Sequence, residues 1–270
     1  MNESLRKLIR TVQSQCYFLK ETKDAFLYNS RRLLSKPHEI EFYALRFVPD
    51  NLPGCYVDVG ANHGQSIESI KIVKPNARVY SFEANILLAQ KLQARYRRRS
   101  DVTVFPYGLA DEAQSRTLFI PVYKKFVYDG DASFDRETAA TYLGPDRLYG
   151  FSPSQLELRE MTCTTQRLDD QNLETLFVKM DVQGYEYQVV KGGIDTIRRH
   201  EPILMIEGFH MNQDLVRLVQ SLGYEEYLFD ETGFYRSSTK NEINSFLMTE
   251  RRASSVTRSG VRDSKASSQT

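Results

Sequence analysis

The stretch at residues 55–64, CYVDVGANHG, constrains the fold of this chain more than any other part of it. Residues 55–59 are apolar enough to form a short buried strand, and the glycine turn at 60–64 leads into the helix-like run Gln65–Val73. Glu83 follows nineteen positions after Gly64, at the end of a second strand-like run. An acidic residue there can accept hydrogen bonds from the ribose hydroxyls of a nucleotide that lies across the strand ends. The stretch therefore predicts a site for an adenosine-containing cofactor.

The residues of the turn separate the candidate cofactors. A dinucleotide fingerprint, Gly-x-Gly-x-x-Gly, needs its middle glycine where the backbone approaches a pyrophosphate. Here the turn reads GANHG at 60–64, without a middle glycine, and Asp58 stands two residues before its start. Asp58 would repel a pyrophosphate but accept a hydrogen bond from an ammonium group. S-adenosylmethionine carries an ammonium and no phosphate, and no Gly-Lys-Ser/Thr follows the turn as it would in a P-loop.

Strand-like and helix-like runs alternate from residue 55 onward, as a parallel sheet requires. The expected fold class is α/β, a Rossmann-like and mostly parallel sheet with helices on both faces. A hairpin of strands 224–229 and 234–236 is predicted to finish the sheet. The other strands are predicted at 56–59, 77–82, 102–106, 116–122, 161–165, 175–180 and 203–206, and the other helices at 38–47, 86–97, 185–190 and 212–222.

One large domain with attached ends fits a chain of 270 residues. We expect a helical extension at 1–50, the main domain at 51–250 and a disordered tail at 251–270, where Ser, Arg and Thr leave little to bury. Residues 124–159 interrupt the alternation and form an insertion longer than most loops. Long loops often carry function, so this insertion is a candidate substrate lid, from which Asp131 and Ser133 could reach the site.

Charge is unevenly distributed along the chain. Residues 1–36 carry eight Lys/Arg and three Asp/Glu, and residues 251–270 carry five and one, so the ends hold +5 and +4 and the body holds −8. An acidic body argues against a nucleic-acid partner. An apolar stripe along 3–34, from Leu5 to Leu19, predicts a helix packed on its own domain or on a homodimer partner. The alternative is a basic amphipathic helix that rests peripherally on a membrane surface.

The number and spacing of the cysteines indicate the redox state of the cellular compartment. Cys16, Cys55 and Cys163 are few and far apart, which fits free thiols in a reducing compartment better than a disulfide framework or a metal cluster. No run of about eighteen apolar residues is present. We therefore expect a cytoplasmic protein, with membrane-peripheral contact through residues 1–34 as the alternative.

Acidic residues stand at four predicted strand ends, namely Asp58, Glu83, Asp181 and Glu207. In an open α/β sheet the ligand crevice lies outside the carboxyl ends of the strands, near the point where strand order reverses. A buried carboxylate without a partner is unfavourable, so four of them at these positions indicate a functional site rather than a structural one.

With these motifs the chain resembles the FkbM-type methyltransferases. The resemblance covers roughly residues 56–235, and its motifs run in order: DVGANHG at 58–64, FE at 82–83, PYGLAD at 106–111, LDD at 168–170 and KMDVQGYE at 179–186. It implies a class I methyltransferase sheet of seven strands with the last antiparallel, S-adenosylmethionine as cofactor, and O-methylation of a sugar or polyketide hydroxyl. Ala84 stands where the family usually has proline after the glutamate, and the insertion diverges from the family.

Cofactor roles follow for residues at the strand ends. Glu83 would accept from both ribose hydroxyls, with Ala84 beside it. Leu109 and Asp111 would lie near the adenine, and the backbone N–H groups of Gln65 and Ser66 would meet the cofactor carboxylate. The methionine pocket would be shaped by Asp58, Gly60, Ala61, Asn62 and Gly64, and Asp181 would border it.

Asp181 is the predicted catalytic base. Lys179 lies two positions before it, on the same side of the strand, and Glu207 and His210 are neighbours able to share the role. Such a base contributes about 10² to 10⁴ in rate. A structural ion pair between Lys179 and Asp181 is the alternative. A second alternative is a divalent cation held by Asp181, Glu186 or Glu207, which the sequence does not require.

We therefore expect an S-adenosylmethionine-dependent O-methyltransferase that acts on a small-molecule or glycan acceptor. The alternative from another class is a non-catalytic module that keeps the fold, binds the cofactor and acts through the basic N-terminal helix. A nicotinamide oxidoreductase is a third reading, which the glycine spacing disfavours.

Overall fold

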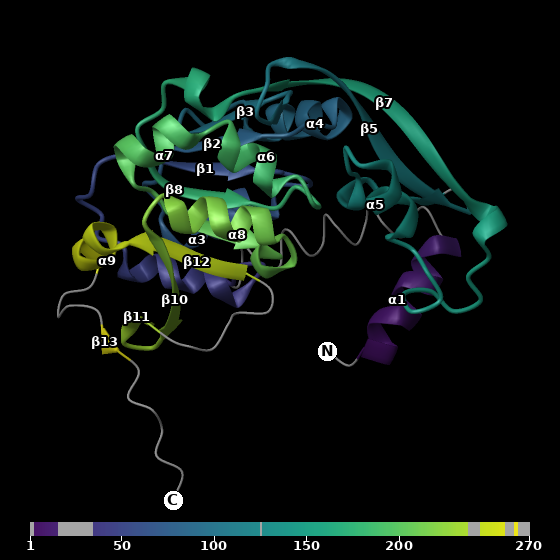
Figure 1. Cartoon of the computed structure of the whole chain (residues 1–270). Coiled ribbons are helices and arrows are strands. Elements are labelled where there is room, and N and C mark those ends of the chain that lie inside the picture. Colours follow the sequence, from purple (N-terminus) through teal and green to yellow (C-terminus); the bar gives the residue numbers. More distant parts are fainter. Residues whose placement is uncertain (1–2, 16–34, 125, 237–243, 257–261, 264–270) are drawn as a thin grey trace, which may run out of the picture.

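The centre of the computed structural model is a mixed sheet of nine strands, within the residues that the structure describes: 3–15, 35–124, 126–236, 244–256 and 262–263 (Figure 1). Its parallel part runs in the order β3-β2-β1-β8-β9, so the order reverses between β1 and β8. These strands are β1 (Cys55–Val59), β2 (Val79–Phe82), β3 (Val102–Phe105), β8 (Thr175–Met180) and β9 (Ile203–Glu207). Each agrees with a predicted strand to within two residues.

The other end of the sheet corrects one prediction. Strands β10 (Tyr224–Asp230) and β11 (Gly233–Arg236) form the expected hairpin, but this hairpin does not finish the sheet. A strand that we did not predict, β12 (Asn244–Thr249), inserts between β9 and β10 and is antiparallel to both. All six residues of β12 are buried. The antiparallel member of the seven-stranded set is therefore β12, and β11 and β13 (Arg262–Asp263) extend its edge.

Helices cover both faces of the sheet because alternate strand residues point to opposite sides. On β1, Tyr56 belongs to one apolar cluster, whereas Val57 and Val59 belong to the other. The first cluster receives α3 (Gln65–Val73), α4 (Ile86–Tyr96), α9 (Glu250–Val256) and the 3₁₀ helix η1 (Ile40–Phe47). The second receives α6 (Glu186–Lys191), α7 (Ile194–His200) and α8 (Gln213–Ser221). The result is a three-layer α/β arrangement.

A second sheet of four strands, in the order β4-β7-β5-β6, extends from the body (Figure 1). Its main pair joins β5 (Gln114–Tyr123) and β7 (Leu156–Gln166) in an antiparallel register from Gln114↔Thr165 to Tyr123↔Leu156. The insertion at 124–159 is therefore not the irregular loop that we predicted, and its last four residues belong to β7. Its remaining elements are β6 (Phe126–Val127), η2 (Asp129–Asp131), α5 (Arg136–Thr141) and η3 (Pro153–Gln155). Outside it, β4 (Gly108–Leu109), η4 (Leu168–Gln171) and η5 (Phe209–Met211) complete the chain.

The N-terminal helix α1 (Glu3–Gln15) is the described part of the helix predicted at 3–34. The remainder of that prediction, with Cys16 and Leu19, lies outside the described residues. Tyr149 donates its backbone N–H to Thr11 Oγ1 at 2.9 Å, and Lys7 lies over the Tyr149 ring. Leu5, Leu8 and Val12 share the outer face and are 47%, 50% and 48% exposed. In the described ranges no helix has both the length and the apolar character to cross a membrane.

The C-terminal tail corrects another prediction. Residues 251–256 were expected to be disordered, but they belong to α9, whose Ala253 and Val256 are buried against the first apolar cluster. Arg252 fastens this helix to the body by donating to the carbonyl oxygens of His200 and Glu201, both at 2.7 Å.

Candidate functional site

A pocket lies outside the carboxyl ends of β1, β2 and β8, at the point where the strand order reverses. Ligands of open α/β sheets bind at such a switch point. The pocket holds about 580 Å³ of space free of atoms, part of it open to solvent. Its lining consists of Val59, Gly60, Asn62, Phe82, Glu83, Ala84, Gly108, Leu109, Leu118, Asp129, Gly130, Ala132, Ser133, Phe134, Asp181, Val182 and Gln183.

The glycine turn forms one wall, and its backbone is fixed from two sides. The N–H groups of Gly60 and Ala61 both donate to the carbonyl oxygen of Phe82, at 3.0 and 3.2 Å. Gly60 has φ +88°, and a Cβ there would lie 1.9 Å from the carbonyl oxygen of Asp181. Only glycine allows this approach of β1 to the end of β8. Asn62, also at positive φ, lines the pocket with a buried Oδ1 that has no hydrogen-bond partner in the described structure.

Glu83 directly follows β2 and lines the same pocket. It accepts from the backbone N–H of Asn62 at 2.6 Å and of Asn85 at 2.7 Å, one on each oxygen. Burial raises the pKa of Glu83 to about 7, against the lowering effect of these two hydrogen bonds. Each carboxylate oxygen has a second lone pair, so Glu83 can accept two more donors from a ligand.

Asp58 lies within β1 and is fully buried, but it does not line the pocket. Ser81 Oγ donates to its Oδ2 at 2.8 Å, and its Oδ1 has no hydrogen-bond partner in the described structure. Burial raises the pKa of Asp58, and the charge of Lys179 opposes that rise. The predicted contact between Asp58 and a cofactor ammonium is therefore not direct in this geometry.

Other predicted cofactor residues divide between the pocket and its supports. Gly60, Asn62, Glu83, Ala84, Leu109 and Asp181 line it, whereas Ala61, Gly64, Gln65, Ser66 and Asp111 do not. The carboxylate of Asp111 pairs outside the lining with Lys191 at 2.9 Å and Arg116 at 3.4 Å, so its contact with adenine stays a prediction that this geometry does not support. Gly64 begins α3 at φ +87°, and Gln65 Oε1 accepts the N–H of His63 at 3.1 Å.

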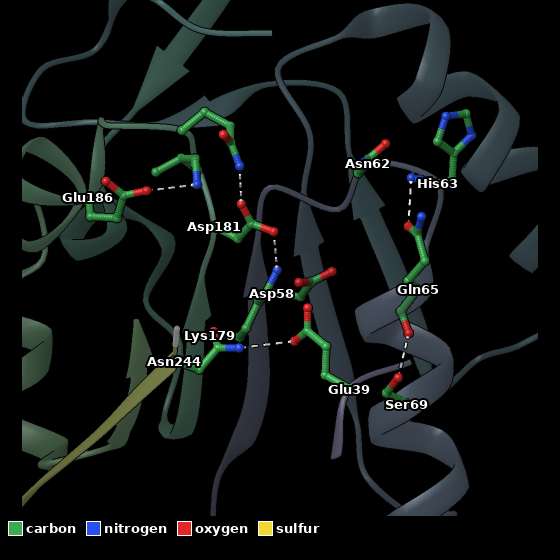
Figure 2. A network of polar contacts seen from close by, with 12 residues as sticks. Glu39, Asp58, Asn62, His63, Gln65, Ser69, Lys179, Asp181, Glu186 and Asn244 are labelled. Atoms are coloured by element: carbon green, nitrogen blue, oxygen red, sulfur yellow. Dashed lines mark hydrogen bonds and ion pairs between the residues drawn. The ribbon is translucent and has the colours of Figure 1, made fainter. Parts of the chain in front are cut away.

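Two of the predicted catalytic residues, the buried Lys179 and the partly exposed Asp181, form an ion pair (Figure 2). Lys179 Nζ contacts Asp181 Oδ2 at 3.0 Å, and Gln183 Nε2 donates to Asp181 Oδ1 at 2.8 Å. Burial alone would raise the pKa of Asp181, but the charge of Lys179 and the side-chain hydrogen bonds to the carboxylate together lower it below its usual value. Burial and the neighbouring Asp181 raise the pKa of Glu207 to about 9. Glu207 therefore favours its protonated form beside the charge of Asp181.

His210 does not join this group. It lies in η5, and its Nε2 contacts Glu226 Oε2 at 2.9 Å, while Ser245 Oγ donates to the other oxygen of Glu226 at 2.6 Å. His210 does not line the pocket, and its catalytic role stays a prediction.

Glu186, one of the three predicted cation ligands, is engaged by backbone groups of its own turn. Glu186 Oε1 accepts the backbone N–H groups of Val182 at 3.1 Å and Gly184 at 3.3 Å, which closes the turn before α6. In the described parts of the chain, no three His, Cys, Asp or Glu side chains are grouped so that they could hold a metal ion.

The insertion supplies the roof of the pocket. Ser133 Oγ donates to the carbonyl oxygen of Gln183 at 3.0 Å, and His63 Nε2 contacts Asp129 Oδ1 at 3.1 Å. Ser133 therefore reaches the site as expected, whereas Asp131 does not line it. Leu118 and Phe134 are pocket residues that sequence reasoning missed, because nothing in their local sequence marks them.

The chain is similar to one family of known proteins. The family described as "Methyltransferase FkbM domain" matches residues 58–226. A comparison with curated proteins gave no match. Among solved structures, the chain resembles a methyltransferase FkbM from Methylobacillus flagellatus at 20% identity and a TM-score of 0.44. That alignment covers 76% of this chain and 47% of the other, so the chain spans less than half of that protein.

Two further solved structures are more distant. A precorrin-6y C5,15-methyltransferase from Geobacter metallireducens is 13% identical, with a TM-score of 0.34 and coverage of 76% of this chain and 83% of the other. A SAM-dependent O-methyltransferase from Thermotoga maritima is 11% identical, with a TM-score of 0.36 and coverage of 79% and 65%. The family match spans more than half of the chain and includes the glycine turn, Glu83, Lys179 and Asp181. The chain belongs to the FkbM methyltransferase family.

Proposed function

We propose that this protein is an S-adenosylmethionine-dependent O-methyltransferase that acts on a hydroxyl of a sugar, glycan or polyketide-like acceptor. Family membership supports methyl transfer. The observation that carries the proposal is that Glu83 and an ionised Asp181 face one pocket at the switch point of the sheet. Glu83 can accept hydrogen bonds from the hydroxyls of a ribose, and Asp181 can accept one from the acceptor hydroxyl.

The pocket residues fit the proposed cofactor. The free lone pairs of Glu83 match two ribose hydroxyls, and the buried Oδ1 of Asn62 lacks the donor that a ligand ammonium would supply. Apolar side chains of Ala84, Leu109 and Phe134 offer a wall for the adenine.

Asp181 has a defined part in the transfer. Bound S-adenosylmethionine supplies a methyl group on a positively charged sulfur, which leaves as a neutral thioether. Asp181 accepts a hydrogen bond from the acceptor hydroxyl and so aligns its oxygen, and alignment alone can supply about 7–11 kcal/mol of the barrier reduction. As the oxygen lone pair forms the new C–O bond, the hydroxyl proton passes to Asp181. A methylated oxygen that still holds its proton is a far stronger acid than any carboxylic acid, so the low pKa of Asp181 does not prevent this step.

The cofactor claim is tested by calorimetric titration with S-adenosylhomocysteine. Glu83→Gln should weaken binding by at least about tenfold, because a hydrogen bond to a charged group is worth about 1.5–3 kcal/mol. Asp111→Asn is the matched control, since that carboxylate is paired with Lys191 outside the pocket and should leave the affinity unchanged. Absence of binding by the folded wild-type protein would remove the proposal.

The catalytic claim needs turnover. Sugar and polyketide alcohols are screened as acceptors, with formation of S-adenosylhomocysteine as the signal. Asp181→Asn should lower turnover by about 10²- to 10⁴-fold, while the affinity for S-adenosylhomocysteine stays the same. A non-catalytic module with the same fold is the alternative, and it would bind the cofactor without turnover of any acceptor.

A further inference from the structure

The roof of the pocket brings one more carboxyl to the site, that of Asp129. Asp129 begins the 3₁₀ helix η2 of the insertion, and its side chain is 16% exposed. Its Oδ1 contacts His63 Nε2 at 3.1 Å, so the carboxyl is joined to the glycine turn at the residue after Asn62. Sequence reasoning named Asp131 of the same short helix instead, and Asp131 does not line the pocket.

The residue after Asp129, Gly130, packs directly against the side chain of Asn62. A Cβ on Gly130 would lie 2.6 Å from Asn62 Nδ2 and 3.2 Å from Asn62 Oδ1. Figure 2 shows Asn62 and His63 beside one another on the turn. Two contacts, Asp129 with His63 and Gly130 with Asn62, therefore hold the Asp129 carboxyl over this turn, and Asp129 and Asn62 line the same pocket.

Both side chains present hydrogen-bond acceptors at the pocket. The buried Oδ1 of Asn62 has no hydrogen-bond partner in the described structure, and a buried acceptor without a donor is unfavourable. The other ionisable side chains among the described residues of the lining are those of Glu83 and Asp181, and this lining includes no lysine, arginine or histidine. It therefore favours a ligand group that is positively charged and donates hydrogen bonds.

S-adenosylmethionine has two positive groups, of which the ammonium carries three N–H donors and the sulfonium carries none. We propose that the Asp129 carboxyl and the Asn62 Oδ1 bind the ammonium of the methionine moiety, an inference that rests on the proposed function. Asp58, which the sequence indicated for this contact, is fully buried, accepts from Ser81 and does not line the pocket. The insertion, rather than β1, thus supplies the carboxyl that recognises the amino-acid part of the cofactor.

The test separates the two halves of the cofactor and needs no acceptor. Each protein is titrated calorimetrically with S-adenosylhomocysteine, which keeps the ammonium, and with methylthioadenosine, which lacks the whole amino-acid part. Asp129→Asn keeps an oxygen for His63 but removes the carboxylate, so it should weaken binding of S-adenosylhomocysteine by about tenfold or more. Its affinity for methylthioadenosine should stay at the wild-type value. Asp131→Asn, in the same short helix but outside the lining, is the matched control and should change neither affinity.

A second variant tests the other acceptor atom. Asn62 has φ +50°, a conformation that glycine adopts without strain, so Asn62→Gly removes the side-chain oxygen and keeps the backbone of the turn. It should also weaken binding of S-adenosylhomocysteine and leave the affinity for methylthioadenosine unchanged. Equal affinities of Asn62→Gly and wild type for S-adenosylhomocysteine would overturn the part assigned to Asn62.

The outcomes separate this inference from the proposed function. Wild-type affinity of folded Asp129→Asn for S-adenosylhomocysteine would overturn the inference alone, and so would an equal loss of affinity for methylthioadenosine, because Asp129 would then act on the roof as a whole. Failure of Asp129→Asn to fold while Asp131→Asn folds would make the carboxyl structural and would also overturn it. A folded wild-type protein that binds neither ligand would refute the proposed function, and this inference with it.

Discussion

The contact between Gly60 and Asp181 gives the sharpest prediction, through the substitution Gly60→Ala. The added methyl group would lie 1.9 Å from the carbonyl oxygen of Asp181 and 3.3 Å from Val182 Cγ1. Gly60 also has φ +88°, a conformation that an L-residue adopts at an energetic penalty. The substitution therefore combines backbone strain with a clash against another backbone segment, which cannot rotate away as a side chain can.

The two contributions have separable magnitudes. Placing alanine at a left-handed φ destabilises by roughly 1–2 kcal/mol, and overpacking adds about 1–3 kcal/mol. Gly60→Ala should thus lower the free energy of unfolding by about 2–5 kcal/mol. Gly223→Ala is the matched control, because Gly223 has φ +81° with nothing within 4 Å of its added Cβ. The control should show the strain alone.

The assay is urea denaturation of both variants, read as the free energy of unfolding, with S-adenosylhomocysteine titration of each folded protein. Gly60→Ala should be the less stable of the two and should bind more weakly, since the clash displaces the loop that carries Asp181. Equal destabilisation by the two substitutions would refute the reasoning, because the close approach of the β1 turn to the β8 end would then have no energetic consequence.

Three further predictions concern charge. Glu207 has a pKa of about 9 in the folded protein and about 4.3 in the unfolded chain, so the folded state holds the extra proton between these values, and the free energy of unfolding should fall as pH rises from about 5 to 9. Denaturation of Glu207→Gln at pH 6 and 9 should show a shallower fall; an identical fall would contradict the assignment. Binding of S-adenosylhomocysteine near pH 7 should release protons, because ribose donors stabilise the anion of Glu83, whose pKa is about 7. Calorimetry in two buffers of different ionisation enthalpy detects this, and equal heats would argue against it. Deleting residues 1–34 should abolish co-sedimentation with anionic vesicles, because the deletion removes the exposed Leu5, Leu8 and Val12 and four net positive charges. Equal sedimentation of the full chain and the deletion variant would contradict a membrane-peripheral role for this region.

Local sequence patterns predicted the centre of the fold well. Strand β8 and helix α3 lie at the predicted residues, because a short apolar run bounded by turn residues and an amphipathic run after a glycine turn are both local signals. The same signals placed Gly60, Asn62, Glu83 and Asp181 at strand ends, where the structure brings them to one pocket.

Features that depend on contacts between distant parts of the chain could not be predicted from local sequence patterns. The position of β12 between β9 and β10 depends on pairing partners far away in the chain, and so does the roof that Phe134 forms over the pocket. Glu39 likewise accepts a hydrogen bond from Asn244 of β12, which lies 205 residues away in the chain. The ion pairs of His210 with Glu226 and of Asp111 with Lys191 likewise join residues that no local pattern brings together.

The placement of β12 has a consequence for how the chain folds. Strand β12 follows β9, β10 and β11 in the sequence, yet it occupies the space between β9 and β10. Until it arrives, both of those strands present an open edge with unpaired backbone groups, and such edges invite pairing with other chains. The non-local closure of the sheet should therefore be a late step, and the interval before it is when this protein is most exposed to aggregation.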